Sequence, residues 1–346
     1  MKKINRSPLM KLIALLCVTV LTMSLLAGCA GSGSKADATA KSENTASSVA
    51  NVIEATSHAV APKNGEKYRI AFIVKSMQSA FFLNMLEGAE ACASDLGSVF
   101  ELTTMAPETP FDVDQQIQLV ENCIANDYDA IVLTPCDSTG IIPAIEACNK
   151  AGIPVITPNT RANGGEVIGY VGIDNHQVGY VVGKAVCDAL GGSGNVLLME
   201  GISGNSTSED RKAGFIEALN EFSNVKLLDS QPADWDREKA MTVTENWLQT
   251  YDKIDAIFTM TKDMGLGSLQ AIDQAGRSKE IMSFTFDIDD DVKEALLEGT
   301  LTGTCNQNER SQGYMALVEV IAYMRGYEVP AEATLPATIL TASDFQ

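Results

Sequence analysis

Short apolar runs alternate with helical patterns from about Tyr68 to Gln346. The runs are rich in β-branched and aromatic residues and nearly continuous, as strands buried on both faces require. They are Arg69–Val74, Ala130–Thr134, Pro154–Thr157, Val167–Ile173, Asn195–Met199, Val225–Leu228, Ala256–Met260 and Ile281–Phe286. Strands that alternate with helices imply parallel sheets with right-handed crossover connections.

The segments between these runs carry apolar residues at helical spacing. They are Phe81–Leu96, Gln115–Asn126, Ile141–Lys150, His176–Leu190, Arg211–Phe222, Glu238–Thr250 and Gly265–Ala275. A glycine follows several of them, as at Gly152 and Gly276, where a helix end favours positive φ. The pattern falls into two blocks divided near Asp174. The sequence therefore predicts an α/β protein with two doubly wound parallel-sheet lobes.

The first residues have the order of a secretory signal peptide. A basic start with Lys2 and Lys3 precedes an apolar run, and small residues precede Cys29 in Leu25-Leu26-Ala27-Gly28-Cys29. This arrangement resembles a bacterial lipobox, which implies a signal peptide over residues 1–28 and lipidation of Cys29. A plain signal peptide with an incidental cysteine is the alternative. A membrane-spanning helix is less favoured because the run is polar-interrupted and shorter than ~20 residues.

Residues 29–66 are dominated by small and polar residues, which predicts a flexible, lipid-anchored linker. The remainder is long enough for two lobes. The formal net charge is −20, which argues against nucleic acid as a partner. We expect an extracytoplasmic protein, lipid-anchored to the cell membrane, and a monomer.

Cysteine and histidine usage argues against metal and nucleophile chemistry. Apart from Cys17 and Cys29, the cysteines are Cys92, Cys123, Cys136, Cys148, Cys187 and Cys305, without a C-x-x-C pair. Only His58 and His176 are present, so a zinc site or a catalytic triad is poorly supported. The cysteines read as buried free thiols, although export also permits a disulfide such as Cys123–Cys148.

Ligands of doubly wound sheets bind beyond the carboxyl ends of the strands. The residues there are rich in carboxylates, amides, hydroxyls and guanidinium, with aromatic rings nearby. No nucleophile elbow, P-loop or dinucleotide fingerprint is present. Planar polar groups with aromatic faces suit a polyhydroxylated ligand. We expect a binding protein without cofactor or metal, not an enzyme.

Several local motifs together resemble the ribose-binding branch of periplasmic sugar-binding proteins, the receptors of ABC sugar importers. The resemblance spans about Tyr68 to Leu340. Its motifs are R-I-A-F-I-V-K-S-M-Q-S-A-F-F (69–82), T-P-C-D-S (134–138), I-P-V-I-T (153–157), G-I-D-N (172–175), D-R-K-A-G-F (210–215), Q-P-A-D-W-D-R (231–237), S-F-T-F-D (283–287) and C-N-Q-N (305–308).

The resemblance implies a type I periplasmic-binding-protein fold with a multi-crossover hinge. It places residues 67–173 and 306–333 in an N-terminal lobe, and residues 174–305 and 334–346 in a C-terminal lobe. Phe81, Phe82 and Trp235 would sandwich a sugar ring, and Arg211, Asp287 and Gln307 would bind its hydroxyls. The expected ligand-binding set is Lys75, Ser79, Phe81, Phe82, Thr134, Asn159, Thr160, Arg211, Trp235, Thr261, Asp287 and Gln307.

Five of these residues also have a purely structural interpretation. One of the two phenylalanines reads as core, Trp235 as a loop anchor, Arg211 as a solvated charge and Asp287 as a helix cap. Asp289, Asp290 and Asp291 read as the cap and first turn of a helix.

The motifs depart from the family pattern at several polar positions. Ser79 and Thr134 replace asparagines, Asn159-Thr160 replaces Asp-Arg with Arg161 one place late, and Thr261-Lys262 replaces Asn-Asp. We therefore expect a small sugar or polyol other than ribose, neutral or weakly acidic, with Lys75, Lys262 and Arg161 tolerating an acidic group.

The predicted function is capture of this ligand between the lobes and delivery to the membrane subunits of an ABC permease. A ligand-sensing receptor for a histidine kinase or chemoreceptor is the alternative. A sugar-responsive repressor would need a DNA-binding helix pair where the signal peptide stands, and a hydrolase would need a carboxylate pair or nucleophile.

Overall fold

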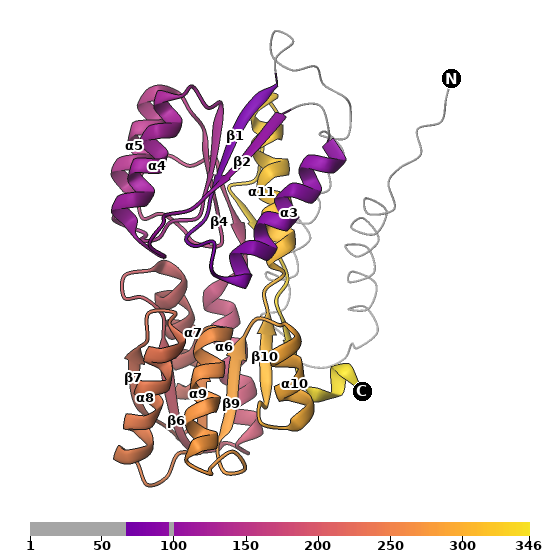
Figure 1. The fold of residues 1–346 in the computed structure, drawn as a ribbon. Helices are drawn as coiled ribbons and strands as arrows, with labels where there is room; N and C mark the ends of the chain where they lie inside the picture. The colour runs from indigo at the N-terminus through magenta and orange to yellow at the C-terminus, as the bar shows by residue number, and fades with distance from the viewer. Residues whose placement is uncertain (1–66, 97–99) are drawn as a thin grey trace, which may run out of the picture.

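The computed structural model describes residues 67–96 and 100–346, which form two lobes, each built on a six-stranded sheet (Figure 1). The paired strands are parallel except at one edge of the second sheet, where the last strand runs antiparallel. The predicted α/β class with two doubly wound lobes is confirmed.

The N-terminal lobe has a central sheet covered by helices on both faces. Its elements are β1 (Tyr68–Ile73), α3 (Ala80–Leu96), β2 (Phe100–Met105), α4 (Val113–Ala125), β3 (Ala130–Leu133), α5 (Ile142–Ala151), β4 (Val155–Pro158), β5 (Gly169–Gly172), α11 (Glu309–Met324) and β11 (Glu332–Thr334). The strand order is β11-β5-β4-β3-β1-β2. Helices α3 and α11 cover one face, and α4 and α5 cover the other (Figure 1).

The C-terminal lobe repeats this plan. Its elements are α6 (Asn175–Ala189), β6 (Ser193–Glu200), α7 (Ser206–Asn220), β7 (Asn224–Pro232), α8 (Arg237–Thr250), β8 (Ala256–Thr259), α9 (Lys262–Gln274), β9 (Met282–Phe286), α10 (Asp290–Glu298), β10 (Gly303–Asn306), β12 (Thr338–Leu340) and the 3-10 helix η2 (Ala342–Phe345). The strand order is β12-β10-β9-β8-β6-β7. Helices α6 and α7 pack as one pair and α8 and α9 as another.

The chain passes three times between the lobes. The passages lie at 173–174 between β5 and α6, at 307–308 between β10 and α11, and at 335–337 between β11 and β12. Hydrogen bonds connect them, because the Leu335 amide donates to the Gly172 carbonyl at 2.6 Å and Asn308 Nδ2 donates to the Pro336 carbonyl at 2.7 Å. The hinge is thus a bundle of three bonded segments. The residue at which each lobe begins stays a prediction.

Two glycines let α6 and α7 approach almost backbone to backbone. A Cβ on Gly179 would lie 2.2 Å from the Arg211 carbonyl oxygen, and one on Gly214 would lie 1.9 Å from the His176 carbonyl oxygen. No other residue fits at these distances. Because Gly179 contacts the backbone of Arg211, the close crossing fixes the position of this arginine on α7 relative to α6.

Several elements went unpredicted because their sequence signal is weak. Helix α11 is buried from Gln312 to Ala322, so it lacks the polar face that reveals a surface helix. Strands β11 and β12 have three residues each, which is too short for a periodic pattern. Strand β2 lies at a sheet edge and carries polar residues.

The predicted signal peptide, Cys29 and the linker over 29–66 lie outside the described residues. Within the described ranges, none of the helices has the length and hydropathy to cross a bilayer. The six cysteines of these ranges are buried free thiols, so the Cys123–Cys148 disulfide is not formed.

Glu319 on α11 provides a pH test of the fold. Its side chain is fully buried, neither carboxylate oxygen has a hydrogen-bond partner among the described residues, and burial raises the pKa to about 8. The unfolded chain releases this proton near 4.5, so the free energy of unfolding should fall as pH rises from about 4.5 to 8.

We expect Glu319→Gln to flatten this slope and to be more stable than the wild type at pH 8. Urea unfolding between pH 5 and pH 9 measures it, with the exposed Glu90→Gln as the matched control. Parallel pH profiles for wild type and Glu319→Gln would contradict the buried-carboxyl interpretation.

Candidate functional site

A cavity of about 280 Å³ lies between the two lobes, at the carboxyl ends of their strands. Loops that follow β1, β4, β7, β8, β9 and β10 line it. The lining includes ten of the twelve expected residues: Lys75, Ser79, Phe81, Phe82, Asn159, Arg211, Trp235, Thr261, Asp287 and Gln307. The carboxyl-end rule for parallel sheets thus places segments distant in sequence around one cleft.

Arg211 is the most constrained side chain of the cleft and is 1% exposed. Its Nε donates to Asn175 Oδ1 at 2.9 Å, one terminal nitrogen donates to the Met260 carbonyl at 2.8 Å, and the other donates to Gln307 Oε1. The guanidinium carbon lies 3.9 Å from the centre of the Phe286 ring. A charge in this position needs such a complete set of acceptors to compensate for lost hydration.

Gln307 connects Arg211 to Asp287. Its amide nitrogen donates to Asp287 Oδ1 at 2.6 Å while its oxygen accepts from Arg211. Burial lowers the pKa of Arg211 to about 10. Burial, with the nearby Glu309 carboxylate, raises the pKa of Asp287 to about 7 against the opposing influence of Arg211. Asp287 lines the cleft, and its carboxyl is a strong hydrogen-bond acceptor only when ionised.

Lys75 is the corresponding charge on the N-terminal lobe. Its Nζ donates to Thr160 Oγ1 at 2.6 Å and lies 5.8 Å from the centre of the Phe82 ring. Burial lowers the pKa of this amine from 10.5 to about 7, and no carboxylate within the described residues forms an ion pair with it. The amine is thus available to bind a ligand oxygen.

Aromatic rings border the cleft on both sides. Phe81 and Phe82 start α3 and contact each other edge to face with centres 5.2 Å apart. On the opposite lobe, the Trp235 ring lies directly over Gly201, where a Cβ would be 1.9 Å from the indole carbon Cη2. The glycine therefore provides the seat for the indole. Flat apolar faces of this kind pack against the C–H face of a sugar ring.

Left-handed backbone conformations concentrate around the cleft. Four residues of its lining have positive φ, namely Phe111 at 62°, Asn159 at 66°, Trp235 at 63° and Asp287 at 67°. This region is unfavourable for residues with a side chain, and aromatic residues in it are genuine outliers. Such strain gathers where a structure must aim side chains at a ligand.

A family model described as a periplasmic binding protein domain matches residues 70–328. The chain belongs to the periplasmic binding protein family. It is 30% identical to the ribose import binding protein of Haemophilus influenzae, over 80% of this chain and 91% of the relative. It is 31% identical to the D-allose-binding periplasmic protein of Escherichia coli, over 76% and 86%.

Solved structures agree with the sequence matches. A periplasmic solute binding protein of an ABC transporter from Actinobacillus succinogenes, with bound D-allose, has a TM-score of 0.75 and 31% identity, over 80% of this chain and 98% of that one. A solute binding protein from Bacillus halodurans with bound myo-inositol has a TM-score of 0.76 and 26% identity, over 82% and 96%. The resemblance inferred from the motifs is confirmed.

Two expected ligand residues of this periplasmic binding protein lie behind the cleft, not on its surface. Thr134 is fully buried, and its hydroxyl contacts Met85 Sδ at 3.8 Å. Thr160 is 1% exposed and bonds Lys75, Asn159 and Thr207. Both were expected at the cleft surface because they follow strand ends, but position at a strand end does not reveal the direction of a side chain.

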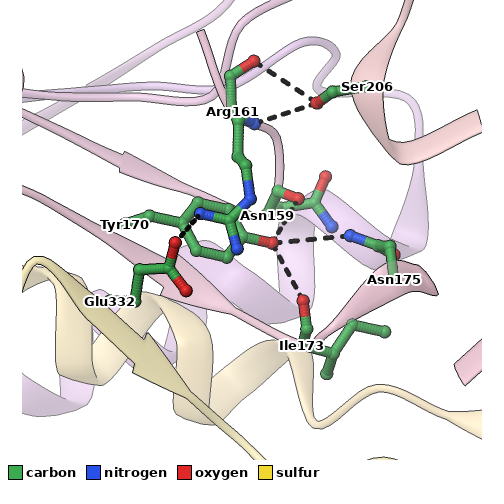
Figure 2. Close-up of polar contacts among 7 residues, drawn as sticks. All are labelled: Asn159, Arg161, Tyr170, Ile173, Asn175, Ser206 and Glu332. Carbon is green, nitrogen blue, oxygen red and sulfur yellow. Dashed lines mark hydrogen bonds and ion pairs between the residues drawn. The ribbon is translucent and has the colours of Figure 1, made fainter. Parts of the chain in front are cut away.

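Arg161 was expected to tolerate an acidic ligand, but it does not line the cleft. Its guanidinium lies 3.7 Å from the centre of the Tyr170 ring and pairs with Glu332 at 3.0 Å (Figure 2). Lys262 lines the cleft but forms an ion pair with Asp289 at 2.5 Å. Asp289 also caps α10, as predicted, so Asp287 is not that cap.

Sequence reasoning missed several lining residues. Phe111 packs against Phe82 with ring centres 6.3 Å apart, and Glu309 accepts from Asn84 Nδ2 at 2.9 Å. Phe111 lies in an irregular loop and Glu309 begins the unpredicted helix α11, so neither position had a pattern to mark it. Phe82 belongs to the core and also lines the cleft, which joins both interpretations offered for the phenylalanine pair.

The seat of Trp235 can be tested without a ligand. The Cβ of Gly201→Ala would lie 1.9 Å from the indole carbon Cη2 of Trp235, so the indole must move. We expect the displaced indole to become more exposed and the tryptophan emission to shift to longer wavelength. The second tryptophan, Trp247, is 1% exposed and should contribute a constant signal. Steady-state fluorescence is the measurement, with the exposed Ser203→Ala as the control. An unchanged emission maximum would show that the ring does not rest on Gly201.

Proposed function

We propose that this protein binds a small sugar or polyol between its lobes and delivers it to the membrane subunits of an ABC importer. The observation that carries the proposal is the buried Arg211–Gln307–Asp287 chain, which presents a donor and an acceptor beside aromatic rings. Vicinal hydroxyls match such alternating groups. The relatives named for ribose and D-allose support the same ligand class.

The charge balance of the cleft favours a neutral or weakly acidic ligand. Its lining carries four cations, Lys75, Arg211, Arg237 and Lys262, against five carboxylates, Asp236, Asp263, Asp287, Asp289 and Glu309. A strongly anionic ligand would meet these carboxylates without an excess of cations. Lys75 offers a buried place for a weakly acidic group, whereas Lys262 is paired with Asp289 and Arg161 does not line the cleft.

The proposed mechanism is closure of the lobes around the ligand about the three crossovers. Closure would bring Lys75 and Phe81 of one lobe against Arg211 and Trp235 of the other. We propose that the protein works as a monomer outside the cytoplasm, anchored to the membrane through a lipid on Cys29. No bond is made or broken in this scheme, so the protein is a binding protein and not an enzyme.

A thermal-shift screen tests the ligand class. The panel contains pentoses, hexoses, inositols and sugar acids, and a ligand at one hundred times its dissociation constant stabilises the fold by about 2.7 kcal/mol. We expect one neutral or weakly acidic member to raise the melting temperature of the wild type but not of Arg211→Lys, which loses the fixed guanidinium geometry. Silence across the whole panel would contradict the proposal.

The affinity for the selected sugar should depend on pH through Asp287. Because the pKa of this carboxyl is raised to about 7, it is ionised above pH 7 and protonated below. If ligand hydroxyls donate to the ionised form, the association constant should fall by up to ~10-fold per pH unit below 7.

Isothermal titration calorimetry between pH 5.5 and pH 8.5 measures this dependence. Asp287→Asn should bind more weakly and lose the slope. Lys75→Met is the matched cleft variant, because its amine also titrates near 7 and its removal should leave the Asp287 slope in place. A slope that disappears in Lys75→Met and persists in Asp287→Asn would assign the titration to the amine.

A further inference from the structure

The hydroxyl of Tyr170 lies where the first crossover leaves the N-terminal lobe (Figure 2). Tyr170 is in β5, and its side chain is 3% exposed. The hydroxyl has one proton and two acceptors within reach, the Asn159 carbonyl oxygen at 3.0 Å and the Ile173 carbonyl oxygen at 3.2 Å. It accepts from Asn175 Nδ2 at 3.5 Å.

These three partners belong to different parts of the hinge and cleft. Asn159 lines the cleft on the N-terminal lobe, Ile173 is in the first crossover, and Asn175 is the first residue of α6 in the C-terminal lobe. One buried oxygen atom therefore contacts both lobes and the segment that joins them.

The contact continues into the binding residues. Asn175 uses its amide nitrogen toward Tyr170 and its Oδ1 to accept from Arg211 Nε at 2.9 Å. Arg211 reaches Gln307, whose backbone carbonyl accepts from Gln312 Nε2 at 2.9 Å. Since Gln307 is in the second crossover, a continuous chain of hydrogen bonds runs from one crossover to another through the cleft.

Arg161 packs on the face of the Tyr170 ring. The Arg161 guanidinium covers it at 3.7 Å and pairs with Glu332 of β11, the strand that leads to the third crossover. Gly172 leaves room for the hydroxyl, because a Cβ there would lie 2.2 Å from the phenol oxygen. Arg161 thus connects the strand before the third crossover to the Tyr170 ring.

The lobes also touch directly beside this ring. The Arg161 amide donates to Ser206 Oγ at 3.2 Å (Figure 2). Thr207 Oγ1 donates to the Asn159 carbonyl at 3.3 Å. Asn205 Nδ2 donates to the Cys136 carbonyl at 3.3 Å. The structure therefore describes the lobes in mutual contact, with the Tyr170 oxygen bonded in that arrangement.

We propose that Tyr170 is a positioning residue that couples occupancy of the cleft to the angle between the lobes. It touches no ligand in this scheme. Through Asn175, Tyr170 fixes the orientation of Arg211. Through Asn159 and Ile173, it fixes the path of the first crossover. Arg211 is therefore oriented for binding in the same arrangement in which the lobes are in contact. The proposal rests on the proposed function and adds the regulation of that same site.

The test uses the ligand-free full chain, so that it does not depend on which sugar binds. Spin labels are attached at Glu108→Cys and Glu238→Cys, exposed positions near the two lips of the cleft, in a Cys17→Ala and Cys29→Ala background. The six described cysteines are buried and should not react. Pulsed electron paramagnetic resonance then gives the distribution of distances between the lobes.

We expect Tyr170→Phe to shift the population toward separated lobes by about 2- to 10-fold, the range that corresponds to loss of one ordinary hydrogen bond. Tyr314→Phe is the matched control, because it removes a hydroxyl that bonds Asp95 of α3 at 3.2 Å, a contact between two helices of the N-terminal lobe. It should lower the melting temperature comparably and leave the distances unchanged.

Arg161→Met provides a second variant that keeps the Tyr170 hydroxyl and removes a half-exposed ion pair, so it should fold even if Tyr170→Phe does not. Releasing the ring should shift the distances in the same direction. The coupling role is overturned if both variants give the wild-type distance distribution, whatever their melting temperatures. A sugar panel without hits would instead contradict the proposed function. The ligand-free distances would still test the role of Tyr170 in the angle between the lobes.

Discussion

The buried guanidinium of Arg211 is the interaction on which the rest of the site depends. A charge at 1% exposure is tolerated only because three oxygen acceptors and an aromatic face surround it. Those acceptors come from α6, the end of β8 and the second crossover. The charge therefore requires that these parts keep their mutual positions, and the glycine crossing of α6 and α7 sets the position of the arginine itself.

The two lobes bring different chemistry to the same cleft. The C-terminal lobe contributes a guanidinium and a carboxyl joined by an amide, which together offer donors and an acceptor at fixed angles. The N-terminal lobe contributes an amine whose pKa burial lowers to about 7 and a pair of phenylalanine rings. In the proposed mechanism, a polyhydroxylated ring uses both sets only when the lobes meet, so that ligand binding and lobe closure would depend on each other.

Hydrogen bonds among the crossovers give that dependence a physical route. Three hydrogen-bonded pairs connect the crossover segments and the strand that leads into them: Leu335 with Gly172, Asn308 with Pro336, and Tyr170 with Ile173. Tyr170 and Gln307 extend the same network to the residues that face the cleft. The three crossovers are therefore hydrogen-bonded to one another, and they are the segments about which we propose that the lobes close.

The sequence by itself determined the class of fold and the composition of the site. Continuous apolar runs and helical spacing specify parallel sheets, and the carboxyl-end rule then names the loops at the cleft. The motif resemblance supplied the twelve expected residues, of which ten line the cleft. The tertiary structure alone decided which side chains point into it. Thr160 and Arg161 follow β4 as Asn159 does, and Thr134 follows β3. All three are nevertheless turned away to other partners, in the case of Arg161 to Tyr170 and Glu332. Side-chain direction at a strand end depends on local φ and on such distant partners, and neither is encoded in a periodic pattern.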